Sequence, residues 1–144
     1  MRDENNELIK IGKEVFEKIG KRIGIEYAII FGSAVKGTLS AESDVDIAVK
    51  FKSLPKHSGT LLKTILKIKD LLEEKMRREV DIVILNRSSL GLWYEVFSTG
   101  KPMYVLSEED FLKDKVRVIK QYLDFKYYID KHFKEKVERI IYGE

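Results

Sequence analysis

The sequence predicts an α/β (α+β) domain in which helices flank a small mixed β-sheet. Segments with apolar residues at helical spacing alternate with short apolar segments typical of strands. The connections between these segments are short, and neither a repeat nor a low-complexity linker divides the 144 residues. We therefore expect one domain spanning residues 1–144, which matches the usual size of a domain.

The first half of the chain contains two predicted helices and two predicted strands. Apolar residues repeat every three or four positions over 5–23, which predicts an amphipathic helix that ends at Gly24. The apolar run 26–31 predicts a buried strand, and the alternating segment 45–51 predicts a second one. Helical spacing returns over about 58–77.

The next part of the chain adds a strand and a helix. The segment 79–85 is apolar except for its charged start, which predicts a third strand. A helix is expected over 88–99, with Ser88 as its N-cap and Gly100 as its stop.

The last two elements are a short strand and a long helix. The segment 102–106 predicts a strand at a sheet edge, where Pro102 is tolerated. Ser107 and Asp110 have the spacing of a capping box, so they predict the start of a helix. Apolar residues at helical spacing extend this helix to about Tyr142.

The composition favours a cytoplasmic protein and excludes several classes. Charged residues make up 35% of the chain, but 27 basic and 24 acidic side chains leave a net charge of +3, which argues against a nucleic-acid partner. The absence of cysteine excludes a disulfide scaffold, a cysteine zinc site and a thiol nucleophile. No apolar run reaches the roughly 18 residues of a membrane span, so we expect no membrane association.

Basic side chains concentrate in residues 52–78, which contain eight basic and three acidic side chains. The simplest interpretation is the solvated face of a helix. The alternative is an electropositive approach for a polyanion or an acidic partner.

A glycine-serine pair follows the first predicted strand. Unpaired N–H groups at a helix start favour anions such as phosphates, and Gly32 would let a ligand approach the backbone closely. Ser33 adds a hydroxyl group, and Lys36 adds a positive charge one turn later. These three residues are candidates for binding a nucleotide phosphate, although such a pair alone is more often a simple turn.

Three aspartates are candidate metal ligands. Asp44 and Asp46 are two residues apart at the start of a strand, so both carboxylates are expected on the face that Ala48 shares. Asp81 interrupts a later apolar strand, and it would complete a triad if that strand lay alongside. Three carboxylates are enough for two Mg²⁺ ions, which prefer oxygen ligands and relieve the repulsion between like charges. Each aspartate taken alone is compatible with a solvated strand position.

The motif Gly32-Ser33, ten residues, Asp44-Val45-Asp46 resembles the G-S-x10-D-x-D motif of the DNA polymerase β-like nucleotidyltransferases. The size and layout resemble the minimal nucleotidyltransferase (MNT) branch of that superfamily. Members commonly have arginines where this chain has Ala34 and Lys36.

The resemblance implies a fold, a site and a reaction. It implies the polymerase β-like nucleotidyltransferase fold, with Gly32 and Ser33 binding the triphosphate of ATP. It implies that Asp44 and Asp46 bind both metal ions, and that Asp81 binds one of them and helps to activate the nucleophile.

The resemblance also implies a partner. MNT proteins commonly act as antitoxins of HEPN ribonucleases, by transferring AMP from ATP to a tyrosine of the toxin. Two alternatives stay open: an antitoxin that neutralises its toxin by docking alone, and a nucleotidyltransferase that acts on a small molecule or an RNA end.

Aromatic residues are frequent in the last two predicted helices. Trp93, Tyr94 and Phe97 are expected in the core. The C-terminal helix carries aromatic residues on more than one face, among them Tyr122, Phe125, Tyr127, Tyr128, Phe133 and Tyr142. Some of these are expected in the core, and the others could form a surface for a partner or a homo-oligomer.

Overall fold

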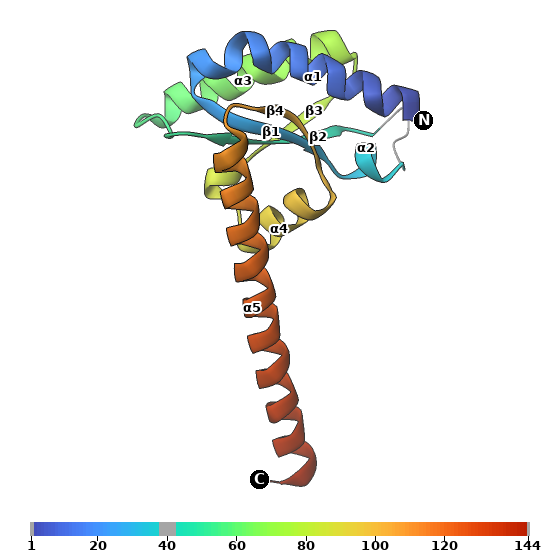
Figure 1. Cartoon of the computed structure of the whole chain (residues 1–144), viewed down its shortest axis with the longest axis vertical. Coiled ribbons are helices and arrows are strands. Elements are labelled where there is room, and N and C mark those ends of the chain that lie inside the picture. The colour runs from blue at the N-terminus through green and yellow to red at the C-terminus, as the bar shows by residue number, and fades with distance from the viewer. Residues whose placement is uncertain (1, 38–42, 144) are drawn as a thin grey trace.

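The computed structural model describes residues 2–37 and 43–143, and its elements alternate between helix and strand (Figure 1). The first elements are α1 (Arg2–Ile23), β1 (Ile25–Phe31), α2 (Ser33–Lys36), β2 (Val45–Phe51) and α3 (Ser58–Met76). They are followed by β3 (Val80–Ile84), a 3₁₀ turn (Leu85–Arg87), α4 (Leu90–Thr99), β4 (Lys101–Val105) and α5 (Glu108–Tyr142).

The strands form a mixed sheet, as the sequence predicts, and their order in the sheet is β3-β2-β1-β4. Strand β1 is antiparallel to both β2 and β4, whereas β2 and β3 are parallel. Helices α1 and α3 cover one face of the sheet, and α4 with the first turns of α5 covers the other (Figure 1). Strand β4 lies at an edge, which explains how the sheet accommodates Pro102.

The alternation of side chains along β2 produces two hydrophobic layers. Ile47 and Val49 pack in the cluster beneath α1 and α3, and Ala48 packs with Phe97 and Phe111 on the opposite face. Asp46 is two residues before Ala48 on the same strand, so its side chain points to the same face of the sheet, the face that carries α4.

One predicted cap is wrong by a residue. Helix α4 begins at Leu90, and the hydroxyl of Ser89 accepts the backbone N–H of Leu92 at 3.2 Å. Ser88 ends the preceding 3₁₀ turn instead, because its hydroxyl donates to the carbonyl of Ile84 at 2.8 Å. The cap of the last helix is confirmed, since Ser107 accepts the backbone N–H of Asp110.

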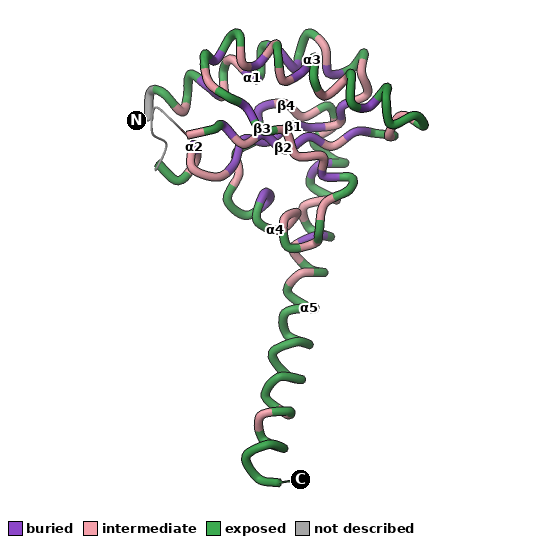
Figure 2. Tube along the Cα trace, turned by 180° about the vertical axis from the view of Figure 1, so that it is seen from behind, coloured by how far each residue is buried: buried purple, intermediate pink, exposed green. Residues whose placement is uncertain are grey.

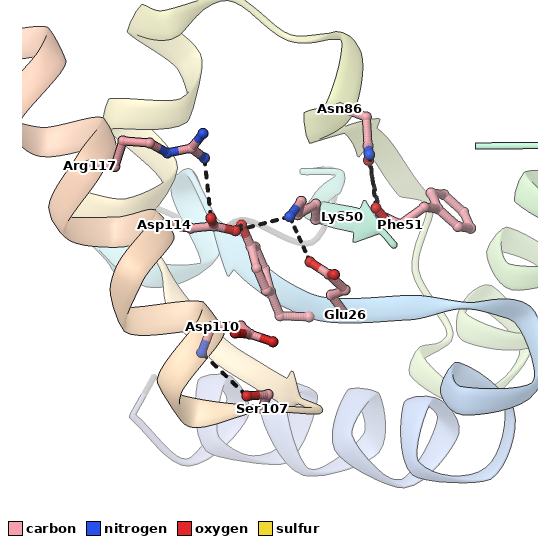
Figure 3. A network of polar contacts seen from close by, with 9 residues as sticks. Glu26, Lys50, Phe51, Asn86, Ser107, Asp110, Asp114 and Arg117 are labelled. Atoms are coloured by element: carbon pink, nitrogen blue, oxygen red, sulfur yellow. Dashed lines mark hydrogen bonds and ion pairs between the residues drawn. The ribbon is translucent and has the colours of Figure 1, made fainter. Parts of the chain in front are cut away.

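A polar network attaches the first turns of α5 to the sheet (Figure 3). Lys50 Nζ lies 2.6 Å from Glu26 and 3.0 Å from Asp114. Asp114 also accepts the hydroxyl of Tyr27 at 2.9 Å and pairs with Arg117 at 3.2 Å. Burial alone would lower the pKa of Lys50, but the hydrogen bonds to Glu26 and Asp114 outweigh it and raise that pKa.

We expect Asp114→Ala to lower the free energy of unfolding by about 2 kcal/mol, because it leaves a part-buried ammonium and a buried phenol with fewer partners. Asp124→Ala is the matched control, since Asp124 is an exposed residue of the same helix and should change stability by less than about 0.5 kcal/mol. Urea unfolding measures both. Equal effects of the two substitutions would contradict a stabilising role of the network.

Helix α5 leaves the domain after its first turns and projects into solvent (Figure 1, Figure 2). Tyr122 stacks on Tyr94 with ring centroids 3.9 Å apart, and Phe97 is buried as predicted. The aromatic residues farther along α5, Phe125, Tyr127, Tyr128, Phe133 and Tyr142, are exposed. Tyr122 is only partly buried and belongs to neither core cluster, so the expectation that some of these residues are in the core is wrong. No helix in the described ranges is long and apolar enough to cross a membrane.

Candidate active site

The turn between β1 and α2 is built around Gly32. Its backbone has φ 76° and ψ −143°, a conformation that side chains rarely allow, and its carbonyl accepts the N–H groups of Val35 and Lys36 at 3.1 Å. A Cβ atom at Gly32 would lie 2.5 Å from Oδ2 of Asp46. Only glycine therefore lets the carboxylate of Asp46 rest against this turn, immediately before Ser33.

The aspartates predicted as metal ligands lie on neighbouring strands. Asp46 is directly opposite Asp81 in the parallel register of β2 and β3, so both are on the same side of the sheet. Asp44 precedes β2 rather than lying in it, because the strand begins where the N–H of Val45 bonds to the carbonyl of Glu79. Asp44 and Asp81 are exposed, and Asp46 is partly buried.

The electrostatics of this group show mutual repulsion. Burial raises the pKa of Asp46, and the negative charges of Asp81, Asp44 and Glu95 raise it further. Within the described ranges, no ion pair forms with any of the three aspartates. A bound cation would remove this repulsion.

The donor chemistry fits a hard divalent ion, since carboxylate oxygens are the ligands that Mg²⁺ prefers. Among residues 2–37 and 43–143, however, no three acidic or histidine side chains converge closely enough to form a ready-made metal cluster. Asp44, Asp46 and Asp81 would therefore have to converge on an ion as it binds.

Lys36 and Glu95 form a second charged pair beside this group. Lys36 Nζ lies 3.8 Å from Glu95, which projects from α4, and both side chains are about half exposed. Glu95 is not a residue that the sequence predicts for this site. A single glutamate on an amphipathic helix carries no local signal, and only the packing of α4 against the sheet brings it near Asp46.

Four of the eight basic residues of 52–78, Lys63, Lys67, Lys69 and Lys75, lie on α3, on the opposite face of the sheet from Asp46 and Asp81. Lys63, Lys67 and Lys75 are exposed there. The position of these four lysines agrees with a solvated helix face and separates their charge from the acidic group. Arg78 is different, because it donates to the carbonyl of Ser43, next to Asp44.

A mixed sheet with two strand aspartates in register, next to a glycine turn, defines the class of this protein as a nucleotidyltransferase. Residues 13–109 match the family described as polymerase beta nucleotidyltransferase. The chain belongs to that family, and the expected fold is confirmed.

Individual relatives agree with this assignment. The protein adenylyltransferase MntA of Thermococcus cleftensis is 33% identical over 76 residues, which cover 53% of this chain and 72% of the relative. A toxin–antitoxin crystal structure with AMP-PNP has a similar fold, with a TM-score of 0.66, 21% identity and coverage of 88% of this chain and 98% of the other.

A third similarity is to the rebuilt structure of a tri-AMPylated HEPN toxin of Shewanella oneidensis in complex with its MNT antitoxin. The TM-score is 0.61 at 18% identity, and the match covers 90% of this chain and 98% of the other. At this identity the similarity concerns the fold.

Proposed function

We propose that this protein is an Mg²⁺-dependent adenylyltransferase that transfers AMP from ATP to a tyrosine of a HEPN toxin and so acts as its antitoxin. The observation that carries the proposal is the contact of the Gly32 turn with Asp46, which itself lies in register with Asp81. This contact supports the proposal, because the turn that we assign to phosphate binding touches one carboxylate and lies next to its register partner.

The comparisons support the choice of donor and acceptor. The relative from Thermococcus cleftensis is named a protein adenylyltransferase, and one protein of similar fold was crystallised with AMP-PNP. A third structure contains an AMPylated HEPN toxin beside an MNT antitoxin. These are properties of the relatives, and we extend them to this chain as a hypothesis.

The reaction requires one bond to form and one to break. The tyrosine oxygen attacks the α-phosphorus of ATP, the bond from that phosphorus to the bridging oxygen breaks, and pyrophosphate leaves. We assign Gly32 and Ser33 to the triphosphate, with Lys36 as a positive charge beside it. Asp81 is exposed at the edge of the sheet, where it can orient the incoming hydroxyl and receive its proton.

Asp44, Asp46 and Asp81 are the residues that would hold metal. When bound there, two Mg²⁺ ions would supply charge neutralisation for the triphosphate and a lower pKa for the attacking hydroxyl. Asp46 is suited to a central role, because it touches the turn and faces Asp81.

The test uses the purified chain with Mg²⁺ and a candidate HEPN toxin from the same genome. ATP labelled at the α-phosphate should label the toxin, and ATP labelled at the γ-phosphate should not. Replacing the acceptor tyrosine with phenylalanine should remove the label. Labelling that survives Asp44→Asn combined with Asp46→Asn would overturn the proposed mechanism.

The same variants separate transfer from docking. If the doubly substituted protein still neutralises the toxin in cells, the antitoxin acts by binding alone. If α-label moves to an RNA or a small molecule and not to the toxin, the chemistry stands and the acceptor is wrong.

Lys36→Met should raise the KM for ATP roughly tenfold with little change in kcat, because a charge that contacts the triphosphate before and during the reaction contributes uniform binding. Lys52→Met is the matched control, since Lys52 is exposed just beyond the opposite end of β2 from Asp46. Steady-state kinetics measure both. A loss of kcat with unchanged KM would contradict the assigned role.

A further inference from the structure

The projecting part of α5 exposes more apolar surface than a free helix would be expected to keep. Phe133, Ile140 and Val116 are 67%, 73% and 65% exposed, and the helix is exposed over most of its length beyond Tyr122 (Figure 2). Helices in proteins owe most of their stability to the packing of an apolar face, and extended exposed apolar patches mark interaction sites. This helix therefore needs a partner surface.

The apolar side chains form a stripe with the spacing of a coiled coil. The stripe, here called the α5 stripe, follows steps of four and three residues along the helix: Leu112, Val116, Ile119, Leu123, Lys126, Asp130, Phe133, Val137 and Ile140. It extends over about four heptads, which is the length that distinguishes a coiled coil from a chance pattern.

The α5 stripe also points away from the domain. Phe111 and Val118 are the buried side chains of α5, whereas Leu112 and Val116 on another face of the helix are exposed. The two exposed residues line a shallow apolar hollow that continues along the helix toward Leu123. A second helix therefore has access to the stripe even next to the domain.

The two charged residues of the stripe indicate the direction of the partner helix. Lys126 and Asp130 lie one turn apart, at the middle of the stripe, and both are exposed. In a parallel pair of identical helices, each of them would face its own copy, and like charges would meet. In an antiparallel pair centred between them, Lys126 of each copy faces Asp130 of the other.

The same centre also brings apolar residues together in all the remaining layers of the pair. In a pair with this centre, two residues face each other when their residue numbers add up to 256. Leu123 therefore faces Phe133, Ile119 faces Val137, and Val116 faces Ile140. The α5 stripe is thus complementary to a second, antiparallel α5 stripe, with apolar residues facing apolar residues and opposite charges facing each other.

We propose that α5 pairs with α5 of a second copy of this chain as an antiparallel two-helix coiled coil, with Lys126 and Asp130 setting the direction and register. Tyr127 and Ile129 flank the centre and would each meet their own copy across the two-fold axis, which adds apolar contact around the two ion pairs. The domains then lie at opposite ends of the pair, so both acidic sites stay accessible. The pairing does not depend on the proposed AMP transfer.

The first experiment measures the mass of the full chain by sedimentation over a wide range of concentrations. We expect a dimer of twice 16.8 kDa. Lys126→Asp and Asp130→Lys should each shift the protein toward monomer, because each substitution places like charges in both central layers. An equal mixture of the two variants should form a heterodimer, and the doubly exchanged chain should again form a dimer.

The second experiment measures direction and uses the absence of cysteine from the chain. In the antiparallel pair, Leu123 faces Phe133 of the other copy, whereas the two Leu123 residues are about 15 Å apart, too far for a disulfide. Leu123→Cys and Phe133→Cys should therefore cross-link when mixed under oxidising conditions, and neither should cross-link alone.

These measurements also contain the results that would overturn the proposal. A monomer at all concentrations would mean that another molecule, such as the toxin, covers the α5 stripe. A dimer that is insensitive to both charge substitutions would use another surface, and cross-linking of Leu123→Cys with itself would show a parallel pair. Circular dichroism verifies that the variants keep their helix content, which is expected because the substituted side chains are exposed.

Discussion

Asp46→Asn should abolish AMP transfer and raise the melting temperature of the metal-free protein. The carboxylate of Asp46 touches the Gly32 turn and lies opposite Asp81, so removing its charge removes a central metal ligand. Loss of such a ligand should reduce the rate by at least about 10³-fold. The same substitution relieves a repulsion that the folded chain imposes and the unfolded chain does not.

The sign of the stability effect follows from the pKa of Asp46. Burial raises this pKa above 3.8, and the charges of Asp81, Asp44 and Glu95 raise it further. At a pH between the two pKa values, Asp46 is protonated in the folded chain and ionised in the unfolded chain. The free energy of unfolding therefore falls as the pH rises from the unfolded pKa through the folded pKa. The asparagine variant avoids this loss, and its advantage should be present at neutral pH and vanish in acid.

Mg²⁺ should reverse the order of the two melting temperatures. The ion binds the folded wild type and stabilises it by mass action, whereas Asp46→Asn should respond weakly. Asp70→Asn is a matched control, because Asp70 is exposed on α3, on the opposite face of the sheet. It should transfer AMP and respond to Mg²⁺ as the wild type does. Residual transfer by Asp46→Asn near the wild-type rate would refute the assignment of this residue.

The sequence predicted the elements of the sheet well, because burial on a mixed sheet leaves strong local patterns. The parity of β2 placed Asp46 on the face of Ala48, as the structure confirms. The pairing of Asp46 with Asp81 did not follow from the sequence, because it depends on which strands are neighbours and in which register they pair. The predicted strand 45–51 agrees with β2, which begins at Val45 with a backbone bond to Glu79, so Asp44 lies just before the strand.

The features that sequence reasoning missed depend on contacts between distant segments. Lys50 occupies an alternating polar position that suggests solvent, yet it bridges Glu26 and Asp114. Glu95 is distant from Lys36 in sequence, and α4 brings the two together. For the aromatic residues of α5, helical spacing indicates an apolar face but does not show which molecule covers it.

Gly32→Ala is expected to have the second large effect, a loss of transfer of at least about 10²-fold. The added Cβ would lie 2.5 Å from Oδ2 of Asp46, so either the turn or the carboxylate must move. A displacement of about 1 Å at a reacting centre costs roughly 10²-fold in rate. The backbone at φ 76° and ψ −143° adds about 1–3 kcal/mol of strain for any side chain.

Substitutions of two other glycines distinguish the steric clash with Asp46 from the effect of backbone strain. Gly37 has the same positive φ of 76°, but no atom of the described residues lies within 4 Å of its Cβ position, so Gly37→Ala introduces backbone strain without that contact. Gly59, at the start of α3, has an ordinary φ and likewise no described atom within 4 Å, so Gly59→Ala introduces neither. If the contact with Asp46 is what matters, only Gly32→Ala should lose both transfer and stabilisation by Mg²⁺.

The outcome distinguishes a structural role of the turn from a role in the reaction. Gly37→Ala should lower the melting temperature and keep the kcat of the wild type, because strain destabilises the fold without moving Asp46. Gly32→Ala should lose transfer even at temperatures where it is fully folded. Equal losses of transfer in these two variants would mean that the turn matters only through backbone strain, and that the close approach of Gly32 to Asp46 does not position the carboxylate for the reaction.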